Sequence, residues 1–294
     1  MANYRQVARH FPAVRDYLRN RRWVRRGDVL AYEPNLLTET FSTDAMGFRH
    51  STHRGKRHSL GETDGTSRYG LVLGSSHVFG FGLADNAQTI ASQLADRLDY
   101  PVLTVAYPEA DSRTLHATLL RTLSTLSRPP EIVVLFNGGD FTRFGFTGKA
   151  DMLFGPPDFI TNAAERDPAS ADVDARRLCY FTTFWADQMV KATQQAGGSR
   201  FVLADEPTFF EKQHPDETET ECQLGLEQAG ASRFALHRRF VWNFLSARQR
   251  FATEVLGTGS WKHLFEKFSY IDEFHYRAQT IAMMADLIAA EATS

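Results

Sequence analysis

The chain has 294 residues, of which 43% are hydrophobic, and its formal net charge at pH 7 is -2. These values are ordinary for one large α/β domain or two small ones, and the two cysteines, Cys179 and Cys222, are too few for a disulfide framework. No apolar run approaches the ~18 residues of a membrane-spanning helix, and the N-terminus lacks the apolar core of an export signal, so we expect a soluble, cytoplasmic protein.

The first part of the chain is basic. Residues 1–58 carry 12 Lys and Arg against 5 Asp and Glu, which leaves 21 against 30 for the remainder. We expect residues 1–60 to form a basic, helical N-terminal extension on a core domain of residues 61–294. Its charge run is interpreted as a solvated helix face, with a docking element for an anionic partner as the alternative and no nucleic acid expected. The run consists of Arg19, Arg21, Arg22, Arg25 and Arg26 around Trp23.

Short apolar runs alternate with helical patterns from residue 68 to the end, which is typical of strand-helix-strand units. We predict a three-layer α/β/α flavodoxin-like sandwich with a mainly parallel sheet of five strands. The predicted strands cover residues 69–74, 101–106, 131–136, 200–204 and 268–271. The predicted helices cover residues 87–98, 112–126, 175–195, 232–256 and 278–290.

Two long stretches without periodicity, residues 141–172 and 208–228, interrupt this alternation. Loops longer than about 12–15 residues are usually functional or disordered, so we interpret both as lids. Phenylalanines in the first stretch either line a cavity or anchor the loop to the domain. They are Phe141, Phe144, Phe146, Phe154 and Phe159.

Reactive residue types follow the predicted strands at the points where the strands end. Ser75 and Ser76 follow the first strand, and Asp272 and His275 follow the last. Because the carboxyl ends of parallel strands lie at one edge, where ligands bind, we expect these side chains to meet. A histidine that an acid orients can activate a serine hydroxyl as a nucleophile. We favour Ser76, because the Ser75 side chain would point to the opposite face of an extended strand end.

Three segments together resemble the SGNH/GDSL hydrolases, in particular the bacterial branch with a Gly-Phe-Arg segment ahead of its core. The segments are Asp-Ala-Met-Gly-Phe-Arg at residues 44–49, Leu-Gly-Ser-Ser-His-Val-Phe-Gly-Phe-Gly-Leu-Ala-Asp at 73–85 and Asp-Glu-Phe-His-Tyr at 272–276. The resemblance implies that Ser76 attacks an ester carbonyl, that His275 is the general base, and that Asp272 orients the imidazole.

The segments that would form the oxyanion hole depart from the family's pattern. The resemblance implies donors from Ser76 itself and from residues after the second and third strands, where this chain has Glu109 and then Asn137, Gly138 and Asp140. A carboxylate there would repel the oxyanion, and a missing donor typically costs ~10²–10³ in rate. Three arrangements stay open: Asn137 supplies the donor, Asp140 is protonated or turned away, or acyl chemistry is reduced. We favour Asn137, because the glycines after it permit an unusual backbone path.

We therefore expect a serine esterase that acts on an O-acylated carbohydrate or another small ester. Two alternatives stay open. One is an O-acyltransferase, in which a sugar hydroxyl instead of water captures the acyl-Ser76 intermediate. The other is a catalytically degenerate member that binds a glycan or a partner protein. The altered segment after the third strand, residues 137–140, favours this alternative.

No cofactor and no metal ion are predicted. The sequence has no Walker-type phosphate loop, and the glycines at 80 and 82 lack the third glycine of a dinucleotide fingerprint. His50, His53 and His58 lie in a basic stretch without an acidic or cysteine ligand, so we interpret that stretch as a solvated loop.

Two more residues lie close to the expected site. His77 follows the proposed nucleophile directly and is left out, because a neighbour in sequence usually points away. Glu206, with Pro207, follows the fourth strand and either lines the pocket or forms a structural turn.

Overall fold

The structure is a computed structural model of the chain. It describes residues 4–26, 29–63, 65, 67–108, 110–138, 140, 168–209, 212–222, 224, 261–272 and 274–293.

A parallel sheet forms the centre of the molecule. Its strands are β5 (Gly70–Gly74), β6 (Val102–Ala106), β7 (Ile132–Leu135) and β8 (Arg200–Leu203), in the spatial order β6-β5-β7-β8. All three pairings are parallel. Residues of β5, β6 and β7 are buried throughout, which explains why these strands appear in the sequence as continuous apolar runs rather than alternating ones.

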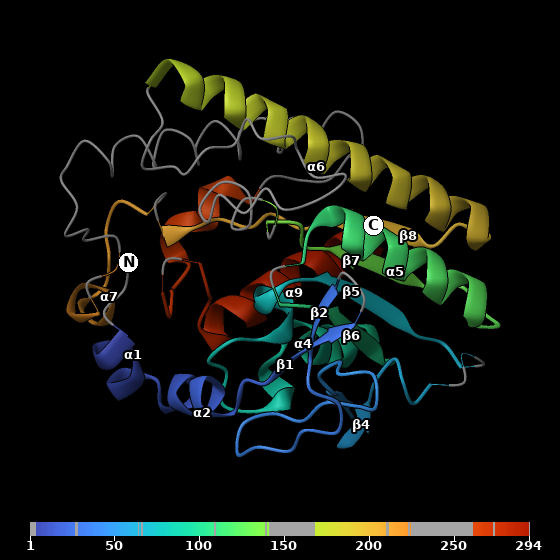
Figure 1. Cartoon of the computed structure of the whole chain (residues 1–294), viewed down its shortest axis with the longest axis horizontal. Helices are drawn as coiled ribbons and strands as arrows, with labels where there is room; N and C mark the ends of the chain where they lie inside the picture. The colour runs from blue at the N-terminus through green and yellow to red at the C-terminus, as the bar shows by residue number, and fades with distance from the viewer. Residues whose placement is uncertain are drawn as a thin grey trace.

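Helices cover both faces of this sheet (Figure 1). Helices α4 (Ile90–Leu98) and α9 (Ala278–Thr293) contact each other on one face, and α5 (Ser112–Thr125) contacts α6 (Pro168–Gly197) on the other. Successive side chains of a strand point to opposite faces, so Val72 belongs to the core cluster of Met284, and Leu73 to that of Leu115. The predicted three-layer α/β/α sandwich is confirmed.

Side-chain caps define where two of these helices begin. The hydroxyl of Thr89 accepts a hydrogen bond from the Ser92 amide at the start of α4. The Asp111 carboxylate accepts one from the Thr114 amide, 2.7 Å away, at the start of α5. Such caps satisfy amide groups that have no partner within the helix. The two caps thus fix the residues at which α4 and α5 begin.

The N-terminal segment differs from the predicted basic helix. It forms α1 (Tyr4–His10) and α2 (Pro12–Asn20), followed by an antiparallel hairpin of β1 (Trp23–Arg26) and β2 (Val29–Tyr32). The helical interpretation of the arginines around Trp23 was therefore wrong for those in β1. Aromatic and β-branched residues favour strands, and a Gly-Asp pair between two such runs is a hairpin signal.

The histidine-containing stretch is also not a solvated loop. Strands β3 (Ser51–His53) and β4 (Lys56–His58) form a second hairpin, and His50 and His53 are buried. The hydroxyl of Ser51 donates a 2.6 Å hydrogen bond to the carbonyl of Val102. This bond fixes the hairpin to the end of the central sheet at β6, which accounts for the burial.

The predicted fifth strand at 268–271 is wrong. An isolated bridge joins Tyr270 to Tyr276, and the chain between them turns back on itself. The segment is buried, which explains its apolar composition. Next to it in the described chain are a short 3₁₀ helix, η6 (Lys262–Lys267), and α9.

The two expected lids are described only in part. Helix α6 already begins at Pro168, within the first stretch, and α7 (Glu217–Glu221) lies within the second. The phenylalanines from 141 to 159 and the helix predicted at 232–256 lie outside the described residues. Within the described parts, these two stretches are therefore not continuous loops.

Val7, Val14, Tyr17 and Tyr32 from the N-terminal segment belong to the same core cluster as residues of α4 and α9. The division between residues 60 and 61 stays a prediction. Among the helices that the structure describes, none combines the length and apolarity needed to cross a membrane.

Candidate active site

Ser76 lies at the carboxyl edge of the sheet, immediately after β5. It is the first residue of a short helix, α3 (Ser76–Phe79), and Ser75 is its N-cap. The turn from strand to helix requires a small residue before it, because a Cβ on Gly74 would lie 2.4 Å from a methyl carbon of Val78. The helix ends at Gly80, whose φ of 85° lies in the left-handed region that glycine adopts without strain.

A chain of hydrogen bonds joins Ser76 to His275 and Asp272. The Oγ of Ser76 lies 2.8 Å from Nε2 of His275, although 199 residues separate the two. The other ring nitrogen, Nδ1, lies 2.8 Å from both carboxylate oxygens of Asp272. An ionised carboxylate only accepts hydrogen bonds, so the proton of a neutral His275 resides on Nδ1, and Nε2 accepts from the serine hydroxyl.

Asp272 is fully buried, yet it is held in its ionised form. Its Oδ1 accepts hydrogen bonds from the backbone amides of Phe274 and His275, and its Oδ2 accepts one of 3.0 Å from the phenol of Tyr4. Burial by itself raises the pKa of Asp272, but the charge of His275 and these hydrogen bonds outweigh it and lower the pKa to about 2.

His275 is kept neutral by its surroundings. Burial lowers its pKa below the ordinary value of 6.5, Asp272 opposes this shift, and the nearby charge of His77 adds to it. The ring of Phe81 lies against the imidazole, with 4.2 Å between the ring centroids. A neutral imidazole with a free acceptor towards a serine hydroxyl is the state that a general base requires.

Arg49, from the Gly-Phe-Arg segment, holds the loop that follows Ser76. Its guanidinium is buried and donates to the carbonyls of Phe79 and Gly80, at 3.0 and 2.8 Å. It also donates to the carbonyls of Thr40 and Asp85 and to the side chain of Asn86. Burial lowers its pKa to about 10. These five bonds fix the end of α3, so Arg49 acts on the site by positioning this turn.

Two of the expected oxyanion-hole residues have other partners. The amide of Gly138 donates to the Glu206 carboxylate, so its N–H is already used. The carboxylate of Asp140 accepts hydrogen bonds from the amide and the hydroxyl of Ser112, at 2.7 and 2.6 Å. These bonds hold the carboxylate at the start of α5, and its expected place among the oxyanion-hole residues stays a prediction.

The folded chain favours the protonated form of Asp140 more clearly than that of any other acid that the structure describes. Burial raises its pKa to about 7, and the negative charge of Asp111 adds to the shift. Of the remaining expected donors, Asn137 is buried two residues after the end of β7, and Glu109 lies outside the described residues.

Three further residues lie around the triad, His77, Glu206 and Tyr4, and sequence reasoning missed the first and the last. The ring of His77 lies 5.0 Å from that of His275, centroid to centroid, and its Nδ1 donates to Glu206 over 3.1 Å. His77 was set aside as if it pointed away, but α3 begins at Ser76, and neighbours on a helix are not on opposite faces. Glu206 joins His77 to Gly138. No signal in the sequence pointed to Tyr4, because its contact with Asp272 joins residues that are 268 positions apart.

Within the described part of the chain, no group of three or more His, Cys, Asp or Glu side chains is arranged to hold a metal ion. His50 instead lies 2.9 Å from the hydroxyl of Ser42 and 3.2 Å from the carboxylate of Glu62.

Neither a protein-family model nor a curated protein sequence matches this chain. Several solved structures are similar to this chain at low identity. Est24, a carbohydrate acetylesterase from Sinorhizobium meliloti, is 13% identical with a TM-score of 0.45, covering 77% of this chain and 99% of its own. An extracellular lipase from Streptomyces rimosus is 11% identical with a TM-score of 0.46, covering 78% and 100%. An aryl esterase from M. smegmatis is 11% identical with a TM-score of 0.43, covering 77% and 99%. At these scores the functional argument rests on the site's own geometry.

Proposed function

We propose that this protein is a serine esterase of the SGNH type, which hydrolyses a small ester or an O-acylated carbohydrate through an acyl-Ser76 intermediate. The observation that carries the proposal is the hydrogen-bonded chain from Ser76 through His275 to Asp272, with 2.8 Å at each link. Burial lowers the pKa of the imidazole and keeps it neutral, and the contact with His275, together with two backbone amides, keeps the carboxylate of Asp272 ionised. A serine becomes nucleophilic in this environment.

In the first half-reaction, Oγ of Ser76 bonds to the acyl carbon while its proton moves to Nε2 of His275. The bond between the acyl carbon and the alcohol oxygen then breaks, and His275 returns the proton to the departing alcohol. In the second half, water attacks the acyl carbon, His275 takes a proton from it, and Ser76 leaves with that proton. Asp272 stabilises the imidazolium each time it forms.

The oxyanion of the tetrahedral intermediate is stabilised in this proposal by the backbone N–H of Ser76 and the side-chain amide of Asn137. Asn137 lies at the carboxyl end of β7, next to the strand that carries Ser76. Preorganised donors of this kind typically contribute ~10²–10³ each in rate. The contact of Asp140 with Ser112 supports this assignment, because it directs the carboxylate to α5. It also weakens the reason for a degenerate binding protein.

Steady-state turnover of short-chain aryl esters tests the proposal. We expect kcat/KM to fall by ~10⁴–10⁶ in Ser76→Ala and in His275→Ala, because loss of either residue removes the nucleophile or its base. Ser75→Ala is the matched control, since Ser75 is buried one position earlier and makes no side-chain cap bond. A fall of only tenfold in Ser76→Ala, or an equal fall in Ser75→Ala, contradicts the proposal.

A further inference from the structure

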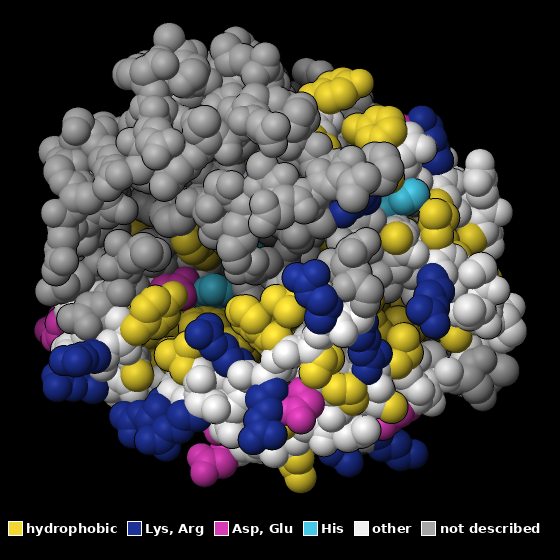
Figure 2. All heavy atoms as spheres, in the orientation of Figure 1, with side chains coloured by type: hydrophobic (Ala, Val, Ile, Leu, Met, Phe, Trp, Pro, Cys, Tyr) yellow, Lys and Arg dark blue, Asp and Glu magenta, His cyan; other side chains and the backbone are white. Residues whose placement is uncertain are grey.

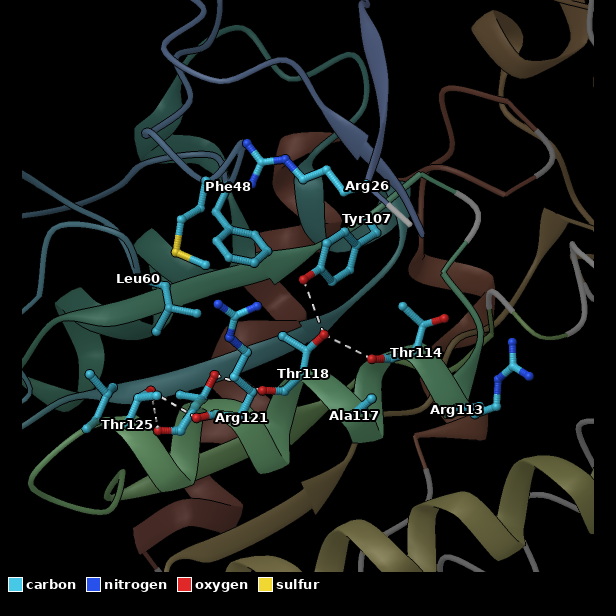
Figure 3. A pocket seen from close by; sticks show the side chains of 13 residues that line it. Arg26, Phe48, Leu60, Tyr107, Arg113, Thr114, Ala117, Thr118, Arg121 and Thr125 are labelled. Carbon is cyan, nitrogen blue, oxygen red and sulfur yellow. Dashed lines mark hydrogen bonds between the residues drawn. The ribbon is translucent and has the colours of Figure 1, made fainter. Parts of the chain in front are cut away.

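A cavity lies away from Ser76, between α5 and the segments that precede β5. Its volume is about 490 Å³, within the range of ~300–1,000 Å³ that is usual for small-molecule sites. None of its lining residues belongs to the Ser76, His275 and Asp272 set. One face of α5 forms its floor, and Arg26 of β1 lies on the opposite side (Figure 3).

The charged residues that the structure describes in the lining of this cavity are all basic. They are Arg26, Arg113 and Arg121, and no aspartate or glutamate is among the described lining residues. Within the described part of the chain, neither Arg26 nor Arg121 forms a salt bridge with an acidic side chain. Figure 3 shows Arg121 rising from α5 towards Phe48 and Tyr107, while Arg26 crosses above both rings. An arginine presents several donors in a planar arrangement that matches carboxylate and phosphate oxygens.

Hydroxyl groups stand beside the two arginines. Oγ1 of Thr118 lies 3.2 Å from the phenolic oxygen of Tyr107 and 2.9 Å from the carbonyl oxygen of Thr114. Its one hydrogen serves only one of the two at a time, and when it points to Tyr107 the phenolic hydrogen is available to a ligand oxygen. The charges of Arg121 and Arg26 both reach this phenol: burial raises the pKa of Tyr107, whereas the two charges lower it. The guanidinium groups and the phenol line the same cavity.

The rest of the lining is apolar. Phe48 and Leu60 are buried, and Met46 and Leu126 are partly buried. Figure 2 shows Lys and Arg side chains interspersed with hydrophobic ones in the region of β1 and β2. A cavity with a cationic rim and an apolar wall complements a molecule that carries an anionic group on an apolar body, in which the wall takes up the body and the arginines neutralise the charge.

We propose that this cavity binds a small amphipathic anion, whose phosphate or carboxylate group is held by Arg26, Arg121 and the Tyr107 hydroxyl and whose apolar part contacts Phe48, Met46 and Leu60. The site is separate from the triad, so binding does not depend on Ser76. It gives the basic N-terminal segment a defined role, in which Arg26 contributes to a ligand site and Arg25, its neighbour on β1, does not.

Calorimetric titration with phenylphosphonate and with octanoate tests this site on the full chain. Both probes pair an anionic group with an apolar body, and the tighter of the two assigns the ligand to the phosphate or the carboxylate class. We expect one molecule of probe to bind per chain. Binding should be at least tenfold weaker in Arg26→Gln and in Arg121→Gln, because each variant loses charge-assisted hydrogen bonds. Inorganic phosphate lacks the apolar body and benzyl alcohol lacks the anionic group, so both should bind more weakly than phenylphosphonate.

Arg25→Gln is the matched control. Arg25 is the exposed neighbour of Arg26 on β1, its side chain points to the other side of the hairpin, and it does not line the cavity. It should bind the probes as the wild type does, and so should Ser76→Ala, which has an intact cavity. The proposal is overturned if neither probe binds at millimolar concentration, if the Arg26 and Arg121 variants keep wild-type affinity, or if Arg25→Gln loses as much. Loss of binding in Ser76→Ala would place the probe at the triad instead and also overturn it.

Discussion

The phenol of Tyr4 donates a hydrogen bond of 3.0 Å to Oδ2 of Asp272, so the first helix of the chain contacts the acid of the proposed triad. Asp272 is fully buried, whereas Tyr4 is 41% exposed. The bond favours the ionised carboxylate and opposes rotation of its two oxygens. Tyr4 is thus a positioning residue that acts through Asp272, and α1 contributes directly to the geometry of the site.

Replacement of Tyr4 by phenylalanine should lower kcat about three- to tenfold and leave KM nearly unchanged. The lost bond is made to a charge but is partly open to solvent, so its contribution lies near ~1 kcal/mol, at the lower end for such bonds. Steady-state kinetics measure the effect. Tyr180→Phe, at an exposed tyrosine of α6, serves as the control and should match the wild type. Wild-type kinetics in Tyr4→Phe would show that the contact has no part in catalysis.

The rate should depend on pH through His275. Its pKa is lowered by burial, so kcat/KM should rise with pH and level off, with an inflection below 6.5. Asp272, with a pKa of about 2, stays ionised throughout that range. An inflection above 7 would show that another group controls the rate.

His77→Gln should move the same inflection to higher pH. The charge of His77 lowers the pKa of His275, and glutamine removes this charge. The direction of the shift is what matters, because a variant that only disturbs packing would lower the plateau without moving the inflection. No movement, or movement to lower pH, is incompatible with the described contact between the two rings.

Glu206 should act through geometry rather than through charge. It accepts hydrogen bonds from Gly138 and His77, and it thereby ties the turn after β7 to α3. Glu206→Gln keeps an acceptor for Gly138 and should stay within about fivefold of wild-type kcat. Glu206→Ala leaves buried donors without a partner, which costs ~1–3 kcal/mol and corresponds to about ten- to hundredfold in kcat. Equal losses in both variants would show that the charge is what matters.

Asp140 should make the stability of the fold depend on pH. Its pKa is raised from 3.8 to about 7, so the folded chain binds a proton that the unfolded chain releases. Its contribution to folding is therefore complete below pH 3.8 and declines as the pH rises to about 7. Asp140→Asn does not titrate, so urea unfolding should show its stability relative to wild type increasing over this window. A constant difference between the two proteins across this range would refute the assignment.

The sheet and its helices were predictable because local signals specify them. Strands β5, β6 and β7 are buried apolar runs, and Asp111 marks the start of α5 with a cap that short sequence patterns reveal. The same reasoning failed at 268–271, where burial made a turn look like a strand. There the Asp272 carboxylate accepts hydrogen bonds from two backbone amides, and these bonds close the turn.

The candidate site was predictable in part from the sequence. Ser76 comes two residues after the end of β5, and Asp272 and His275 are three residues apart, but the strand expected ahead of them does not form, so strand ends alone do not explain their meeting. The contacts of Tyr4 and Glu206 span 268 and 129 residues. No periodicity or motif links such distant positions, because side-chain packing in the folded chain alone brings them together.

Labelling by a fluorophosphonate, followed by intact mass, tests the nucleophile most directly. If Oγ of Ser76 is activated by His275, it bonds to phosphorus and displaces fluoride, so the wild type and Ser75→Ala should each gain the mass of one bound probe. Ser76→Ala should gain none. A labelled Ser76→Ala variant, or a wild type that stays unlabelled at excess probe, would contradict the account.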